Sequence, residues 1–143
     1  MFVGTHAHKL DDKGRLTLPA KFREQLAGGM LVTRGQDRCL VIYSPEKFEE
    51  IALRAAAASK VDEKARMFQR TLMSSTEEMV PDAQGRITLS AEHRRYAGLS
   101  KACTVIGNFD NIEVWDSQAW EAYQSQHEES YSRGDNPALG SIL

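Results

Sequence analysis

The chain contains the same thirteen-residue motif twice. Residues 11–23 read DDKGRLTLPAKFR, and residues 82–94 read DAQGRITLSAEHR, so the second copy begins 71 positions later and seven positions are identical. At an offset of 72, four further pairs match: Gly35 with Gly107, Leu40 with Ile112, Tyr43 with Trp115 and Phe48 with Trp120. About 45 residues therefore occur twice. A unit of this size buries little core alone, so we expect the two copies to interlock in one β-rich body.

Both copies have the same predicted order of elements. In each, a short strand (5–8 or 76–80) leads into a tight turn that ends in Gly14 or Gly85. Polar and apolar residues alternate over 15–18 and 86–89, which predicts half-buried strands with Arg and Thr on one face. Short helices follow at 20–26, with Pro19 in the first turn, and at 91–97, with Ser90 as N-cap. Hairpins are predicted from 30–33 with 40–43 and from 103–106 with 112–115.

Helical patterns lie between and after the copies. Apolar residues at helical spacing predict two helices separated near 59–62; they are Phe48, Ile51, Ala52 and Ala55, then Ala65, Phe68 and Leu72. A helix from about Ser117 carries an aromatic stripe that we interpret as packing: Trp120, Tyr123, His127 and Tyr131. The expected organisation is repeat 1 at 5–47, a helical connector at 48–75, repeat 2 at 76–119, a C-terminal helix at 120–131 and a flexible tail at 132–143.

Composition narrows the possible classes of protein. The chain has 143 residues, and its apolar runs are too short for a membrane-spanning helix. The first fifteen residues lack the pattern of a secretory signal. Cys39 and Cys103 do not make a disulfide framework, so buried thiols in a reduced cytosol are expected. The histidines are scattered without a nucleophile or paired carboxylates, so we expect neither an enzyme nor a cofactor. His6 and His8 alternate and could share a metal, although surface imidazoles are the simpler interpretation.

The charge is distributed unevenly along the chain. The formal net charge is −2, but residues 1–75 carry a net +4 and residues 76–143 a net −6. Within 9–23, five basic residues stand against two aspartates. This asymmetry favours an anionic partner for the first half, although a cluster of charges can also be only solvated surface.

The repeated motif resembles that of the MraZ family, which belongs to the SpoVT-AbrB, or swapped-hairpin, class. The resemblance rests on the two copies of Asp-x-x-Gly-Arg, at 11–15 and 82–86, and on their separation. The opening MFVGT, RRYAGL at 94–99 and EVWD at 113–116 also resemble that family. The resemblance extends over the chain to about Tyr131.

This resemblance implies a fold and a function. The implied fold is α+β and β-rich, with two tandem swapped-hairpin repeats interlocked in one pseudo-dimeric barrel and flanked by helices. The implied function is sequence-specific DNA binding, in general as a repressor, at short repeated sites upstream of the regulator's own gene in the division and cell-wall cluster. It also implies a ring-like homo-oligomer in the cytoplasm, associated with the nucleoid. No membrane or small-molecule substrate is expected.

The family's Asp-x-x-x-Arg motif, implicated in DNA contact, falls on Asp11 with Arg15 and on Asp82 with Arg86. Arginine suits bidentate contact with guanine or phosphate, and the aspartate can fix its rotamer. The alternative for Arg15 is a purely structural ion pair. The predicted DNA-binding residues are Arg15, Arg86, Lys13, Lys9, Thr17, Lys21 and Arg23, with Asp11, Asp82, Gly14 and Gly85 in support. The three lysines and Arg23 are expected to contact phosphates, although each of them can instead be solvated surface. The second copy is less basic, which leaves its own share of DNA contact open.

Two interpretations compete with DNA binding on the same fold. One is an antitoxin-like subunit that binds a protein partner, and the other is a protein-binding scaffold. Antitoxin subunits of this class typically carry one motif copy and a long tail, whereas here the motif is duplicated and twelve residues follow Tyr131.

Overall fold

The computed structural model describes residues 1–140 and 142. The strands are β1 (Thr5–Lys9), β2 (Arg15–Thr17), β3 (Met30–Arg34), β4 (Leu40–Tyr43), β5 (Glu77–Met79), β6 (Arg86–Thr88), β7 (Ala102–Gly107) and β8 (Ile112–Asp116). The helices are α1 (Ala20–Arg23), α2 (Pro45–Ser59), α3 (Glu63–Ser75), α4 (Ala91–Tyr96) and α5 (Ser117–Arg133). Short 3-10 turns are η1 (Glu24–Leu26), η2 (Gln36–Arg38) and η3 (Pro137–Leu139). The fold is therefore α+β, as expected.

The two repeats exchange strands. A six-stranded antiparallel sheet has the order β1-β7-β8-β4-β3-β5, and β2 pairs with β6 in a separate two-stranded ladder. The first strand of repeat 1, β1, pairs with β7 of repeat 2, and the first strand of repeat 2, β5, pairs with β3 of repeat 1. The repeats thus form one body. In the part of the chain described, β1 and β5 are the edges of the larger sheet, so that sheet is open.

The main core lies where the repeats meet. Leu16 and Leu18 of the first motif and Ile87 and Leu89 of the second are all buried in it. These residues alternate with the polar residues of β2 and β6, so each strand turns its aliphatic side chains inward. The buried face of this small ladder therefore fixes the direction of its polar face.

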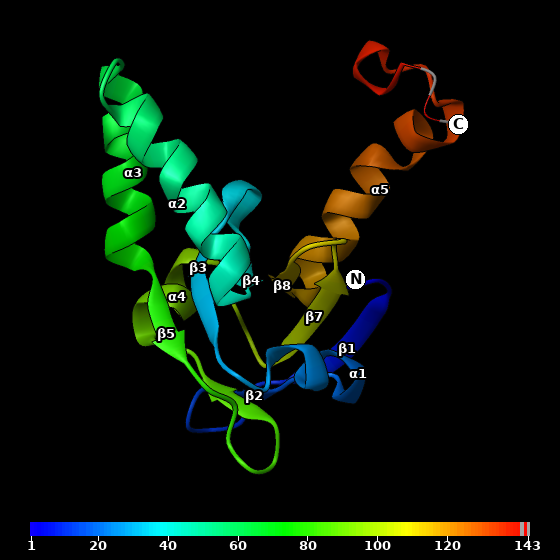
Figure 1. Cartoon of the computed structure of the whole chain (residues 1–143). Coiled ribbons are helices and arrows are strands. Elements are labelled where there is room, and N and C mark those ends of the chain that lie inside the picture. The colour runs from blue at the N-terminus through cyan, green and yellow to red at the C-terminus, as the bar shows by residue number, and fades with distance from the viewer. Residues whose placement is uncertain (141, 143) are drawn as a thin grey trace.

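Two helical arms extend from the sheet. Figure 1 shows α2 and α3 side by side as one arm and α5 as the other, both pointing away from the β2–β6 end of the molecule. Their starts are capped as expected for helices: the side chains of Ser44, Asp62 and Asp116 accept backbone N–H groups of the first turns. No helix among the described residues is both long and apolar enough to cross a membrane.

The predicted helical stripes are only partly correct. Phe48 and Ala55 of α2 are buried, as predicted, and Leu72 of α3 packs with them. Phe68, however, is 50% exposed, because α3 turns the side that carries Ala65 and Leu72 toward α2. The prediction that Phe68 belongs to the core stripe is therefore wrong.

The aromatic stripe of α5 packs only at its beginning. Trp120 and Tyr123 lie against Trp115 of β8, with ring centroids 5.2 and 4.9 Å from it. His127 contacts Tyr123, but Tyr131 is 90% exposed, because α5 has left the sheet by that point. Packing is thus the wrong interpretation for Tyr131.

The remaining predictions differ mainly at the ends of elements. The helix expected at 20–26 is divided into α1 and η1, and α5 continues to Arg133, into the segment expected as a flexible tail. Within that segment η3 covers 137–139, and positions 141 and 143 lie outside the described residues. Ser90 caps α4 as predicted, with its hydroxyl accepting the N–H of His93. Cys39 and Cys103 are free and buried, as expected.

Candidate nucleic-acid interface

The two motif copies meet in the β2–β6 ladder. Arg15 lies opposite Thr88, and Thr17 lies opposite Arg86, in antiparallel register. Because Leu16 and Ile87 point into the core from the middle of each strand, these four polar side chains share the other face. The structure therefore brings Arg15 and Arg86, which are 71 residues apart in sequence, onto one small surface.

Arg15 is held by Asp11. Its Nε donates to Asp11 Oδ2 at 2.6 Å, while Asp11 Oδ1 accepts the backbone N–H groups of Lys13 and Arg15, each at 2.9 Å. The ion pair expected as the structural alternative is thus present. It engages only Nε of the guanidinium, and among the described residues the two terminal nitrogens of Arg15 make no hydrogen bond. An oriented arginine with free terminal N–H groups suits bidentate contact with an acceptor.

The second copy repeats the contacts between aspartate and arginine, but here Nη2 of the arginine also donates to Gln84 Oε1 at 3.4 Å. Arg86 Nε donates to Asp82 Oδ2 at 2.8 Å, and Asp82 Oδ1 accepts the N–H groups of Gln84 and Arg86 at 2.9 Å. The backbone N–H of the arginine, followed by its guanidinium, lowers the pKa of each aspartate. Both carboxylates are therefore ionised at neutral pH and keep the two arginines oriented.

Gly14 and Gly85 make the two turns possible. Their φ angles are +73° and +76°, in the left-handed region that favours glycine. The carbonyl of Gly85 accepts the N–H of Leu18, and the carbonyl of Gly14 accepts the N–H of Leu89, both at 2.9 Å. Each turn is thus hydrogen-bonded to the strand end of the other repeat.

Arg23 lies against the second turn. Its Nε donates to the carbonyl oxygen of Leu18 at 3.0 Å and its Nη1 to that of Gln84 at 3.3 Å. In repeat 2, Arg94 Nε donates to the carbonyl oxygen of Leu89 at 3.2 Å. Arg23 therefore links the segment after β2 to the second turn through two of its nitrogens, which leaves fewer N–H groups for the predicted phosphate contact.

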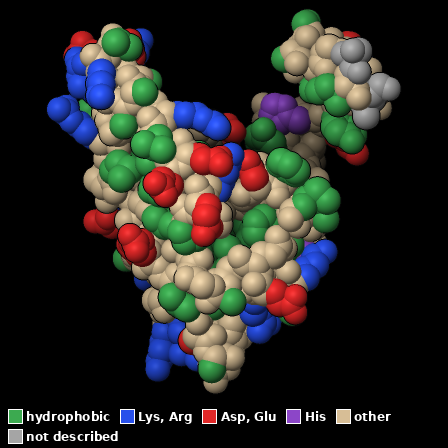
Figure 2. All heavy atoms as spheres, viewed as in Figure 1, with side chains coloured by type: hydrophobic (Ala, Val, Ile, Leu, Met, Phe, Trp, Pro, Cys, Tyr) green, Lys and Arg blue, Asp and Glu red, His purple; other side chains and the backbone are tan. Residues whose placement is uncertain are grey.

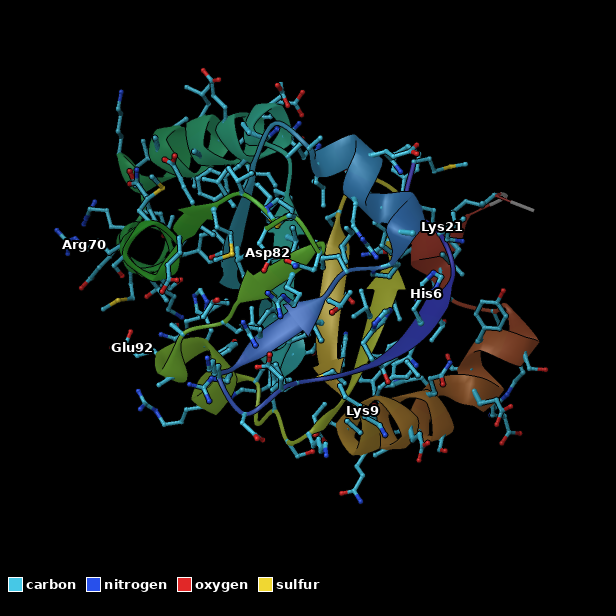
Figure 3. All side chains as sticks on the ribbon, turned by 90° about the horizontal axis from the view of Figure 1, so that it is seen from below. His6, Lys9, Lys21, Arg70, Asp82 and Glu92 are labelled. Carbon is cyan, nitrogen blue, oxygen red and sulfur yellow. The ribbon has the colours of Figure 1, made fainter. Side chains whose placement is uncertain are left out.

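The three predicted lysines are exposed around the ladder. Lys13 lies in the first turn, Lys9 ends β1, and Lys21 is on α1 with its Nζ 5.8 Å from the Phe22 ring centroid. In the view from below in Figure 3, Lys9 and Lys21 lie on one side of the ladder. Figure 2 shows Lys and Arg side chains gathered at the lower end of the molecule, where β2 and its turn lie in Figure 1. This end presents the positive charge that an anionic partner needs.

His6 and His8, considered above as a possible metal pair, both lie on β1. The His6 ring packs edge-on against Phe22, with centroids 5.2 Å apart. Among the described residues, no group of three or more His, Cys, Asp or Glu side chains could hold a metal ion.

The structure brings together a second group of basic residues, which was not among the predicted site residues. Arg34 and Arg38 border the turn between β3 and β4, and the structure places them on Tyr96 of α4, next to Arg95. The signal available in the sequence was two arginines at a predicted hairpin turn. Their proximity to α4 depends on the interlocking of the repeats, which the local pattern does not contain.

Taken together, fold and site define a class: a tandem-repeat α+β protein that presents two aspartate-oriented arginines on one interlocked ladder. A family model described as "MraZ protein, putative antitoxin-like" matches residues 1–71 and again 72–141, in agreement with the two repeats. Relatives named "Transcriptional regulator MraZ" occur in Nocardia farcinica, at 58% identity, and in Mycobacterium avium and Rhodococcus opacus, at 59%. Each aligns over 143 residues, which is 100% of both chains.

The chain belongs to the MraZ family, which confirms the resemblance seen in the motifs. The full-length similarity to regulators of that name supports a transcriptional regulator. Proteins named as transcriptional regulators are generally not enzymes.

Proposed function

We propose that this chain is a transcriptional regulator that binds specific DNA sequences through the outer face of the β2–β6 ladder. The observation that carries this proposal is the half-buried pair Arg15 and Arg86, each oriented by its own aspartate on the outer face of the ladder. A structural ion pair alone does not require both arginines to share a solvent-facing surface.

The chemistry of this face suits the major groove of DNA. A two-stranded antiparallel ribbon fits in that groove, and an arginine can donate to O6 and N7 of guanine together. Thr17 and Thr88 lie opposite the arginines and offer hydroxyl groups to either kind of base edge. Lys9, Lys13 and Lys21, with the remaining N–H groups of Arg23, contact phosphates, which position the protein without reading sequence.

The membership of the MraZ family supports a particular regulatory role. In this proposal the chain binds short repeated sites upstream of its own gene and represses the cluster for division and cell-wall synthesis. It acts in the cytoplasm, in association with the nucleoid.

The proposal also includes a ring-like homo-oligomer of interlocked barrels. The strand exchange between repeats supports the swapped-hairpin arrangement of each subunit. Each of the two arms has exposed apolar side chains that can contact another copy of the chain. They are Met67 and Phe68 on α3, and Tyr131 on α5. Two unlike patches on one chain produce head-to-tail contacts, which form a ring when the rotation between neighbouring copies closes.

A protein-binding role similar to that of antitoxins is the second candidate. It is supported by the words "antitoxin-like" in the family description and by the exposed ring of Tyr131 on α5. In that case the arms bind a different protein, and the ladder has a structural role.

Footprinting on the DNA upstream of the chain's own gene tests the proposal and distinguishes it from this second candidate. A DNA-binding regulator protects short repeated sequences there at physiological salt and leaves a shuffled duplex unprotected. Equal protection of both duplexes, or of neither, contradicts the proposed function.

A further inference from the structure

A basic hollow lies outside the ladder, between the turn of repeat 1 and the helix of repeat 2. It has a volume of about 460 Å³, and its lining includes Arg34 and Arg38 from repeat 1 and Arg95 and Tyr96 from repeat 2. Buried His93 forms part of the lining, with its Nε2 2.6 Å from the carbonyl oxygen of Ser75 at the end of α3. Because a carbonyl only accepts, Nε2 is the donor, and this bond ties α4 to α3.

Two of the three arginines that line this hollow, Arg34 and Arg38, lie on an aromatic ring. The guanidinium carbons of Arg34 and Arg38 lie 4.2 and 4.9 Å from the centroid of the Tyr96 ring. The Tyr96 hydroxyl donates to the carbonyl oxygen of Gly35, which fixes the ring against the turn. Stacking on one ring orders both guanidiniums and leaves their N–H edges available.

No ion pair within the described residues neutralises these positive charges. Among the described residues, Arg34, Arg38 and Arg95 form no ion pair with a carboxylate, although Glu92 also lines the hollow. Two guanidiniums near one ring repel each other, and an anion bound close to them relieves that repulsion. The chemistry of the hollow therefore suits a phosphate group.

Helix α4 runs between the hollow and the first motif turn. A Cβ atom placed on Gly14 would lie 3.1 Å from the Arg94 guanidinium, so α4 reaches the first motif turn. Arg95 follows Arg94 directly, and Figure 3 shows α4, marked by Glu92, beside the ladder in the view from below. Helix α4 thus carries a basic side chain at each place: Arg94 lies at the first motif turn, and Arg95 lines the hollow.

The other side of the ladder has no such cluster. By the repeat alignment, Arg34 and Arg38 correspond to Ile106 and Asp110 at an offset of 72. Arg95 and Tyr96 correspond to Glu24 and Gln25 at an offset of 71. Asp110 is instead paired with Lys47 at 3.1 Å. The basic hollow is therefore a feature of one side only, and general folding of the repeat does not require it.

We propose that Arg34 and Arg38, stacked on Tyr96 and flanked by Arg95, bind a phosphate of the DNA backbone next to the segment read by the ladder. This inference rests on the proposed function and adds a second surface to it. In this arrangement the bound DNA runs from the ladder across α4. Repeat 2 then also contacts DNA through α4.

The test is the salt dependence of DNA binding by the full chain carrying Arg34→Gln and Arg38→Gln. Each lost phosphate contact lowers the slope of log K against log salt by about 1. We expect affinity for the operator and for a shuffled duplex to fall by the same factor, roughly threefold to tenfold at physiological salt. The variant Arg34→Lys with Arg38→Lys retains the charges and should retain the slope.

Arg54→Gln with Arg133→Gln is the matched control, because it removes the same charge from exposed positions on the two arms. Light scattering checks that all variants have the same oligomeric mass as the wild-type chain. Thermal melts check that all of them are folded. A slope unchanged in the Arg34/Arg38 variant, or changed equally in the control, overturns the inference.

A site for a free anion is a distinct outcome. Inorganic phosphate would then raise the Tm of the wild-type chain and not that of the Arg34/Arg38 variant, while the salt slope of DNA binding stays the same. That result also overturns the inference. If the wild-type chain shows no preference for its operator, the proposed function fails instead, so the two failures can be distinguished.

Discussion

Arg15 and Arg86 are each oriented by the aspartate four residues earlier in the chain. The carboxylate accepts Nε of the arginine and two backbone N–H groups of its own turn, so turn and side chain are fixed together. An arginine oriented before binding loses less conformational freedom when it contacts a base. The same ion pair thus serves the turn and the proposed recognition of DNA.

The aspartates predict a specific acid sensitivity. Their pKa values lie below the ordinary 3.8, first because of the backbone N–H groups of Arg15 and Arg86. A carboxyl whose pKa is lowered by folding stabilises the folded state above its unfolded pKa, and this stabilisation is lost as the pH falls. The wild-type chain should therefore have a higher Tm than Asp11→Asn/Asp82→Asn at neutral pH, with a difference that shrinks below about pH 4.

Thermal melts of both proteins between neutral pH and the lowest pH at which they remain folded measure this difference. Asp12→Asn, in an exposed neighbouring position, is the control. A Tm difference that grows as the pH falls would contradict the assigned role of the aspartates.

At the scale of elements, the motif turns are expected to be highly sensitive to substitution of their glycines. Each glycine has a positive φ, and a Cβ on Gly85 would lie 2.3 Å from Arg23 Cδ, whereas the nearest atoms to one on Gly14 are 3.1 Å away. Gly85→Ala should lower the free energy of unfolding by more than about 1–2 kcal/mol, the usual cost of the left-handed conformation, and by more than Gly14→Ala does.

Urea denaturation measures these free energies. Gly28→Ala is the matched control, because Gly28 has no positive φ and nothing within 4 Å of an added Cβ. If Gly28→Ala and Gly85→Ala destabilise equally, the turns do not carry the strain assigned to them.

The sequence predicted strands and turns better than helix faces. Polar and apolar residues alternate over both motif strands, and only one register buries Leu16 and Ile87, so the outward direction of the arginines follows from the pattern. Helix faces depend on what lies beside them. Phe68 and Tyr131 fit their stripes by spacing, yet each lies where no other element of the described chain covers it. The spacing of apolar residues therefore does not predict that these two side chains are exposed.

At the scale of the whole molecule, strand exchange brings charged residues of the two halves together. Counted along the sequence, the second half carries a net −6 and looked less suited to DNA. In the structure, the β3–β4 turn of repeat 1 packs on α4 of repeat 2, so basic residues of both halves come together around Tyr96. No local pattern in the sequence predicts this, because it depends on which strands pair across the repeats.

The proposed ring predicts avidity. One chain presents few basic contacts, so it should bind a single site weakly, whereas an oligomer on two or three repeated sites gains from effective concentration. Gel shifts with one, two and three operator repeats should show affinity that rises by roughly 100-fold or more from one to three sites. Equal affinity for all three duplexes contradicts this prediction, and Tyr131→Ser, if it breaks the oligomer, should remove the increase.

The most direct test of the central claim is the preference for operator over shuffled DNA in the variant Arg15→Ala/Arg86→Ala. The account predicts that the double variant stays folded, keeps non-specific binding through its lysines and loses the preference, with each arginine contributing about 1–3 kcal/mol of discrimination. Arg54→Ala, on the α2 arm, should retain the preference. If the double variant still prefers its operator at physiological salt, the ladder is not the surface that reads DNA.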